Sequence, residues 1–341
     1  MEQKRNQFLD IIKALCIVFV IITHDTISEE TRLKLLFNFW IDMAVPLFMI
    51  ISGYVYALSF ERNGIAQIQQ AYTLNFIMPK FIRYTIPFLL AFAIEILGEI
   101  AVAFLAIRPF SLKHIVALLF QGGNGPGSYY YPILLQFLLY YPVLYFIIKR
   151  YAFKGLILCF AINAGYEFFQ RVWGCNETFY RMLLFRYTLV IAFGSYLGQC
   201  KGEKLALGWK IASFAAGTAF IIAYRYFAFP PRIIIYWTKT SFLACLYLLP
   251  IAAFLICSVH LRFKPLELIG KASFNIFLVQ MVYYAYAAGF AAKFFSSHIV
   301  HLCFHIGICI SAGLIFYAIE QPLTKFALSM WNSRKKLCRV K

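Results

Sequence analysis

Three side chains in the first apolar segment of the chain have the chemistry of proton transfer or anion binding. Lys13 and His24 follow Asp10 at offsets of 3 and 14 residues, so a helix would carry all three on one face. Lys13 and His24 are eleven residues apart, which is roughly 16 Å along a helix axis. The lysine therefore marks one end of this segment, and the histidine lies deep in it or near its far end.

His24 carries the sharper signal, because imidazole can take a proton from a hydroxyl group near neutral pH. Asp25 follows it directly, and Asp42 is expected at the same level, near the start of the second apolar segment. A carboxylate beside an imidazole raises its basicity and can fix its tautomer. We therefore predict that His24 is catalytic and that Asp25 or Asp42 orients it; a packed, hydrogen-bonding histidine is the alternative.

A pair of cations, Lys80 and Arg83, precedes the third apolar segment and shares a helix face at i, i+3. Such a pair could clamp the phosphate groups of a donor. Anchoring of a helix end by positive charge explains the same spacing. For Lys13, the simpler interpretation is an ion pair with Asp10 at a helix end.

The segments that carry these residues are too apolar for a water-soluble protein. Of 341 residues, 62% are hydrophobic and 13% charged, against roughly 25% charged in a soluble domain. The apolar residues fall in runs of about 20, the length of a membrane-spanning helix. We predict an all-α, polytopic membrane helix bundle of about ten transmembrane helices, at roughly 8–28, 37–60, 84–106, 129–148, 152–170, 182–200, 208–227, 241–260, 272–292 and 299–320.

Charge sets the expected orientation of this bundle. The net charge of +18 does not indicate nucleic-acid binding, because the basic residues occupy short connections between apolar runs. With the N-terminus inside, most Lys and Arg fall in inner connections and the tail, so both termini are expected to be cytoplasmic. Most of the nine cysteines lie within apolar runs without metal-ligand spacing, so no metal site is expected.

No segment is long or polar enough to form a separate soluble domain. We therefore expect one transmembrane domain over residues 1–341, ending in a short basic cytoplasmic tail at about 325–341. The longest outer connection, at about 107–128, ends in a glycine-rich tract that suggests flexibility. It is either a lid or acceptor-access loop, or a plain connector.

Several further charged residues fall within the apolar runs. They should pair with other groups of the bundle, and lining an acceptor cavity is the alternative. These residues are Glu95, Glu99, Glu167, Arg186, Arg225 and Glu320.

Short motifs spread over the chain resemble the membrane-bound acyltransferase 3 family. They are Phe8–Leu15, His24, Val45–Tyr54, Gly127–Phe137, Tyr141-Pro142, Ile269–Leu278 and Glu320-Gln321-Pro322. In that family an Arg or Lys is followed after ten residues by a His, and Lys13 and His24 match this spacing. The family's third-helix cation pair is similar to Lys80 and Arg83. Two residues depart from the pattern: Gln280 stands where a His is common, and Lys80 replaces the first Arg.

The resemblance implies an integral acyltransferase of a bacterial plasma (inner) membrane. The co-substrate would be cytoplasmic acyl-CoA, with acetyl-CoA the first choice, and its phosphates would be held by Lys13, Lys80 and Arg83. The acceptor would be a hydroxyl group of a surface polysaccharide or lipid-linked glycan. His24 would be the catalytic residue, either as a base, which we favour, or as an acylated intermediate.

Two other classes of function fit parts of the pattern. A transporter or exporter of a glycan or small acid would also use buried charges and a basic inner face. A binding or scaffolding membrane protein without chemistry is the third possibility, and it gains support from the missing late-chain histidine.

Overall fold

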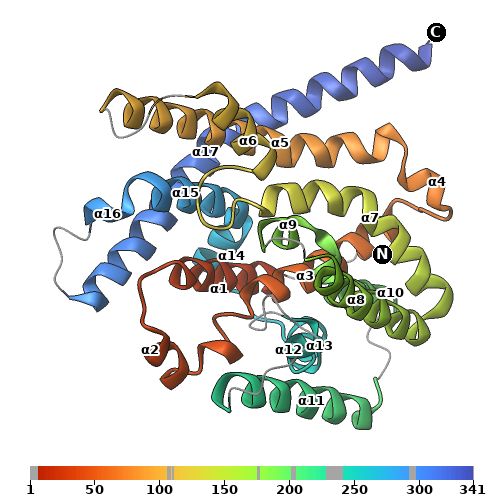
Figure 1. The fold of residues 1–341 in the computed structure, drawn as a ribbon. Helices are drawn as coiled ribbons and strands as arrows, with labels where there is room; N and C mark the ends of the chain where they lie inside the picture. The colour runs from red at the N-terminus through yellow and green to blue at the C-terminus, as the bar shows by residue number, and fades with distance from the viewer. Residues whose placement is uncertain are drawn as a thin grey trace. The chain divides into compact units, whose positions relative to one another are not determined.

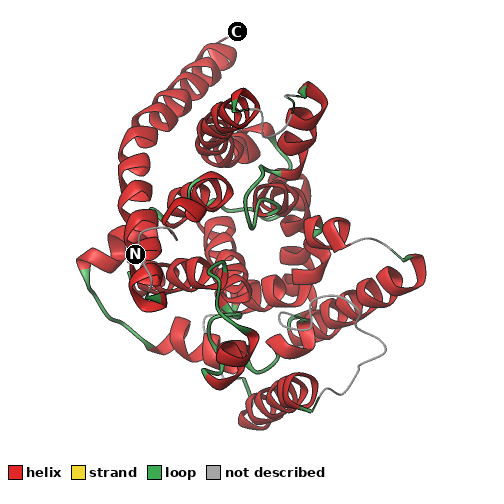
Figure 2. Cartoon of the chain, turned by 60° about the vertical axis from the view of Figure 1, so that its left-hand side comes forward, coloured by secondary structure: helices red, strands yellow, loops and turns green. Residues whose placement is uncertain are grey.

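The computed structural model describes residues 7–105, 109, 111–174, 177–200, 205–227, 241–291 and 297–340. Every regular element within these ranges is a helix (Figures 1 and 2). The N-terminal half contains α1 (Phe8–Thr23), α2 (Glu29–Lys34), η1 (Phe37–Phe39), α3 (Ala44–Arg62), α4 (Ile68–Ala71), α5 (Leu74–Phe104), α6 (Leu112–Gln121), α7 (Tyr130–Tyr151) and α8 (Phe153–Trp173). The remaining helices are α9 (Glu177–Met182), η2 (Leu184–Tyr187), α10 (Thr188–Gln199), α11 (Leu207–Tyr226), α12 (Phe242–Cys245), α13 (Leu248–Ser258), α14 (Lys264–Lys271), α15 (Ser273–Tyr286), α16 (Ala288–Ala291) and α17 (His298–Val340).

The predicted all-α membrane bundle is confirmed. Each of the ten predicted spans overlaps one of the longer helices. Among the described residues, five segments are long and apolar enough to cross a membrane. They are Phe37–Arg62, Ile68–Phe104, Tyr130–Tyr151, Leu207–Tyr226 and His298–Ser333. The residues of the predicted basic tail continue α17 up to Val340.

The chain divides into two compact units. Unit 1 comprises Met1–Ala71 and Leu139–Gly270, and unit 2 comprises Tyr72–Leu138 and Lys271–Lys341. The boundary between them falls inside α7, so this helix contributes to both. The prediction of a single functional domain over the whole chain stays a prediction.

In unit 1, α3 and α10 pack with their backbones in close contact. Gly53 lies against the backbone of Ile191, and Gly194 lies against the backbone of Ile50. Small residues permit this approach, which a β-carbon would prevent. The buried hydroxyl of Tyr141 donates to the Gly53 carbonyl at 2.9 Å. This helix pair is the frame on which α1 and α8 also pack.

In unit 2, α15 packs on α17 and α5. Gly313 of α17 lies against Ile276 of α15, which allows the two helices to approach closely. Beside them, Asn275 donates to the Glu320 carboxylate at 3.1 Å, and Thr324 donates to its other oxygen. Glu320 is therefore paired within the bundle, as the sequence led us to expect.

The predicted outer connection at 107–128 contains a helix, α6 (Leu112–Gln121). Ser111 caps this helix by accepting from the His114 backbone N–H at 3.4 Å. Gly122 ends it in the left-handed conformation, at φ 87°. Residues 106–108 and 110 lie outside the described part of the chain.

Candidate functional site

His24 lies at the C-terminal end of α1, in the half-buried position that caps the helix. Its backbone N–H donates to the Ile21 carbonyl at 3.2 Å. The chain then turns, because the Asp25 carboxylate accepts from the backbone N–H of Thr26 at 2.8 Å. The imidazole is thus carried by the last turn of a rigid helix. We call His24, Asp25, Arg32, Asn38 and Asp42 the His24 end of unit 1.

Arg32 joins three segments at the His24 end. Its Nη2 donates to the Thr23 carbonyl at 2.7 Å, and its Nε donates to the Ile27 carbonyl at 3.3 Å. Its Nη1 lies 3.9 Å from Oδ1 of Asp42. A cation at the C-terminus of a helix is favourable, because the last carbonyl groups carry partial negative charge. Arg32 was not among the residues predicted from the sequence. The available signal was its place in a predicted outer connection, where the positive-inside rule disfavours a cation.

Asp42 is 7% exposed, and its backbone N–H donates to the Phe37 carbonyl at 3.0 Å. The structure therefore brings Asp42 to the His24 end, where Arg32 is its ion-pair partner. The predicted role of Asp25 and Asp42 in orienting the imidazole stays a prediction.

Asn38 of η1 is another residue that sequence reasoning missed. It is 1% exposed, and neither atom of its side-chain amide has a hydrogen-bond partner within the described ranges. Leaving a buried amide unpaired costs about 1–3 kcal/mol. Asn38 therefore keeps a donor and an acceptor that a bound ligand could use.

A second arginine, Arg181 of α9, acts electrostatically on His24, as does Arg32. Arg181 also pairs with Glu177 at 2.5 Å. The neighbouring Tyr180 donates to the buried carboxylate of Glu167 at 2.5 Å. Glu167 is thus engaged by the protein, in agreement with the expected pairing of intramembrane charges.

Two further charges were expected to pair within the bundle, and both do. Arg225 of α11 forms an ion pair with Glu29 of α2. Arg186 of η2 donates to the Tyr187 hydroxyl at 2.6 Å. The first contact, with a hydrogen bond from Tyr226 to the Leu33 carbonyl at 3.0 Å, holds α2 against α11.

Lys13 lies about three turns before His24 on α1. Its Nζ is 3.4 Å from Oδ1 of Asp10, which confirms the expected i, i+3 pair. Asp10 is buried, and a quarter of the Lys13 side chain is exposed. The exposed part of the Lys13 side chain could therefore contact a ligand without a change in α1.

Lys80 and Arg83 belong to unit 2, whereas Lys13 and His24 belong to unit 1. Within α5 the two cations are brought together, and Arg83 acts electrostatically on Lys80. Lys80 Nζ lies 3.5 Å from the centre of the Phe76 ring. Arg83 is exposed. The geometry is that of two adjacent positive groups on one helix face.

The glycine-rich tract after α6 is held in place by two buried carboxylates of α5. The backbone N–H of Asn124 donates to Glu95 at 3.3 and 3.2 Å, and its amide donates to Glu99 at 3.0 Å. Tyr286 donates to Glu99 at 2.6 Å, and His114 Nε2 lies 3.5 Å from this carboxylate. These hydrogen bonds fix the tract at Asn124. We call these five residues the Glu99 network.

Gln280, which departs from the family pattern, supports the same tract. Its side-chain amide donates to the Pro126 carbonyl at 3.3 Å. It is fully buried, and its Oε1 has no hydrogen-bond partner in the described part of the chain. The glutamine thus positions a turn rather than titrating.

Fold and site together define a multi-pass membrane protein with a histidine and buried ionic groups at one helix end. Residues 6–319 match the acyltransferase 3 family model, described as an acyltransferase domain. The chain therefore belongs to this family and is a membrane acyltransferase. Comparison with curated proteins and with solved structures gave no match.

Proposed function

We propose that this acyltransferase moves an acyl group, with acetyl the first choice, from cytoplasmic acyl-CoA to a hydroxyl of a surface polysaccharide or lipid-linked glycan. The membrane is the bacterial plasma membrane. The observation that carries the proposal is the position of His24 on a helix end fixed by Arg32 and Asp42. A base works only when it is held at a constant place relative to its hydroxyl substrate.

The reaction follows from elementary acyl-transfer chemistry. His24 accepts the proton of the acceptor hydroxyl as its oxygen attacks the thioester carbonyl carbon. The carbon–sulfur bond breaks as the carbon–oxygen ester bond forms. The proton held by His24 passes to the departing CoA sulfur, which leaves as the thiol. Asp25 or Asp42 orients the imidazole through these steps.

Three cations would hold the donor. Lys13, Lys80 and Arg83 are proposed to bind CoA phosphates, because ammonium and guanidinium groups form charge-assisted hydrogen bonds with phosphate oxygens. Replacement of the first family Arg by Lys80 keeps the charge but loses the two-pronged geometry of a guanidinium group. The donor affinity should therefore depend more on Arg83 than on Lys80.

The proposal is tested by transfer of radiolabel from acetyl-CoA to membrane glycan in vesicles at matched expression. Native protein should transfer label, and His24→Ala and Arg83→Ala should not. The matched controls His260→Ala and Lys325→Ala change exposed side chains that have no proposed role, and they should transfer normally.

Folded His24→Ala protein with full transfer activity would refute the catalytic role. If native protein transfers no label from any of a panel of acyl-CoAs, the donor class is wrong. Uptake of a glycan or small acid into vesicles without any acyl donor would instead support a transporter.

A further inference from the structure

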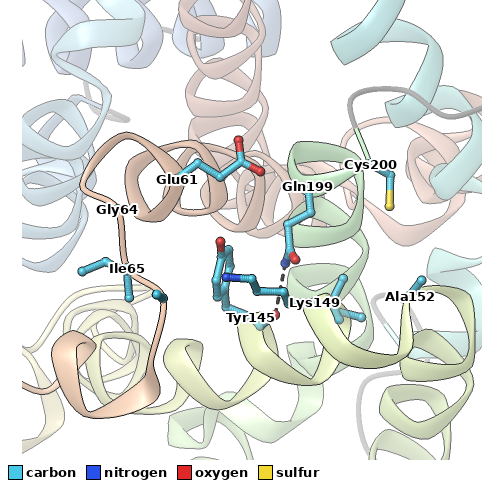
Figure 3. Close-up of a pocket in the computed structure, with 10 residues that line it drawn as sticks. Glu61, Gly64, Ile65, Tyr145, Lys149, Ala152, Gln199 and Cys200 are labelled. Atoms are coloured by element: carbon cyan, nitrogen blue, oxygen red, sulfur yellow. Dashed lines mark hydrogen bonds between the residues drawn. The ribbon is translucent and has the colours of Figure 1, made fainter.

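A pocket of about 510 Å³ lies in unit 1 between the C-terminal ends of α3, α7 and α10 (Figure 3). This volume is in the range of pockets that hold small ligands. Its polar lining is Glu61, Tyr145, Lys149 and Gln199. Ile65, Ala66, Ile148 and Ala152 add apolar surface.

Glu61 and Lys149 are exposed, and neither forms a salt bridge with any described residue. The ammonium group of Lys149 instead lies near two aromatic rings, at 5.8 Å from that of Tyr145 and 5.6 Å from that of Phe146. The pocket therefore presents a carboxylate and an ammonium group that do not form an ion pair with each other.

Gln199 adds a fixed acceptor. Its Nε2 donates to the Tyr145 carbonyl at 3.2 Å and to Ser195 Oγ at 2.9 Å, as the dashed line in Figure 3 shows for the first bond. With the nitrogen held in this way, Oε1 is oriented and accepts no hydrogen bond from the described residues. The site thus offers two acceptor groups, at Glu61 and Gln199, and one cation.

These groups select the class of ligand. The Lys149 ammonium group favours a negatively charged group such as a phosphate, and the Glu61 carboxylate and Gln199 Oε1 favour a hydrogen-bond donor such as an amino group. A ligand that carries both an amino group and a phosphate satisfies both. The apolar part of the wall suits a flat ring or a short carbon chain.

Helices α1 and α3 pack on each other, and the sequence predicts that they are successive membrane spans, which run in opposite directions. On that prediction, the pocket at the C-terminal end of α3 lies at the end of unit 1 opposite to His24. Arg62 and Arg150, both exposed, follow Glu61 and Lys149 in sequence. By the charge bias, this is the predicted cytoplasmic end.

We propose that this pocket binds an amino-bearing phosphate ester, with Lys149 on the phosphate and Glu61 and Gln199 on the amino group. Two sources have this chemistry. One is the adenine nucleotide end of acyl-CoA, and this source rests on the proposed function. The other is the headgroup of an ethanolamine phospholipid at the membrane surface, which is independent of that function.

Calorimetric titration of adenosine 3′,5′-bisphosphate into the full-length protein, held in phosphatidylcholine nanodiscs, tests the nucleotide source. Lys149→Met and Glu61→Gln should each weaken binding about tenfold. Arg150→Met and Arg62→Met change neighbouring exposed cations that do not line the pocket, and they should change the affinity less than about twofold. An equal loss in Lys149→Met, Arg150→Met and Arg62→Met, with no loss in Glu61→Gln, would overturn the proposal, because it would indicate general attraction of the nucleotide to positive charge.

The lipid source is tested in nanodiscs that contain phosphatidylethanolamine. If this lipid weakens nucleotide binding to the native protein, or is retained in native mass spectra and lost in both pocket variants, the same site takes the headgroup. If neither compound binds, or both bind the pocket variants as they bind native protein, the proposal fails. Nucleotide binding without acyl transfer would refute the proposed function while leaving the pocket assignment intact.

Discussion

The His24 end of unit 1 and the Glu99 network of unit 2 are both clusters of buried polar groups, but they use their hydrogen bonds differently. In the Glu99 network, the carboxylates of Glu95 and Glu99 accept hydrogen bonds from a neighbouring turn and a tyrosine, so their oxygens are already bonded to other groups of the protein. At the His24 end, Arg32 fixes the backbone, while the Asn38 amide remains unused by the described residues.

The contrast separates structural polar groups from groups that can act on a ligand. A buried polar group costs free energy unless it is paired. A network whose members pair with each other can lower that cost without any ligand. A buried polar group that stays unpaired in the protein can recover this free energy only by hydrogen bonding to a ligand or to water. Such a group is therefore a candidate for ligand binding.

The largest effect is expected from His24. His24→Gln replaces the imidazole by an amide of similar size that cannot accept the proton, so the rate of acyl transfer should fall about 10²–10⁴-fold. The melting temperature should stay within about 2 °C of native. The measurement is single-turnover transfer from labelled acyl-CoA, with the exposed-site variant His260→Gln as control. A comparable loss in both variants would place the effect outside the His24 end.

Arg32→Ala should destabilise unit 1 by about 3 kcal/mol, because it removes the guanidinium group that pairs with the buried Asp42 carboxylate. It also releases the Thr23 carbonyl next to His24, so the transfer rate should fall as well. Arg32→Lys should recover part of the stability, since the charge remains. The free energy of unfolding in mild detergent gives the first effect. If Arg32→Ala protein is as stable as native, the ion pair does not fix this end.

Glu99→Ala should cost about 2 kcal/mol, because it leaves Tyr286 and the Asn124 amide with fewer partners. Unlike the His24 end, the Glu99 network is expected to matter for stability and not for catalysis. The folded fraction should therefore transfer acyl groups at nearly the native rate. Hydrogen exchange should rise at Asn124 and its neighbours. Loss of transfer in fully folded Glu99→Ala protein would contradict the distinction between the two clusters.

The sequence predicted what depends on local spacing. The apolar run lengths predicted the long helices, and the i, i+3 rule predicted the pair of Asp10 with Lys13 and the proximity of Lys80 to Arg83. It could not predict that Asn124, in a glycine-rich tract, would be held by Glu95 from 29 residues away. That contact arises from tertiary packing, which a single sequence does not encode as a local pattern.

The same reason explains the missed groups. Arg32 matters because it reaches Thr23 and Asp42, and the pocket exists because the ends of α3, α7 and α10 meet. Each residue alone has an ordinary surface or loop character in the sequence. Only the fold places them together.

The smallest effect, of about 1 kcal/mol, separates the two kinds of polar group most directly. Asn38→Leu removes a buried amide that has no partner in the described structure, so stability should stay unchanged or rise by about 1 kcal/mol. If the amide binds the acceptor, the KM for glycan should rise about fivefold at nearly constant kcat.

The matched control for Asn38 is Asn163→Leu. Asn163 is equally buried, but its amide donates to the Arg186 carbonyl at 3.0 Å and accepts from the Leu189 N–H at 2.8 Å. This variant should lose about 2 kcal/mol of stability, because two buried backbone groups lose their partner. Thermal unfolding and acceptor titrations of both variants give the comparison. Equal destabilisation would mean that Asn38 is satisfied within the protein, and a normal KM in Asn38→Leu would remove it from the acceptor site.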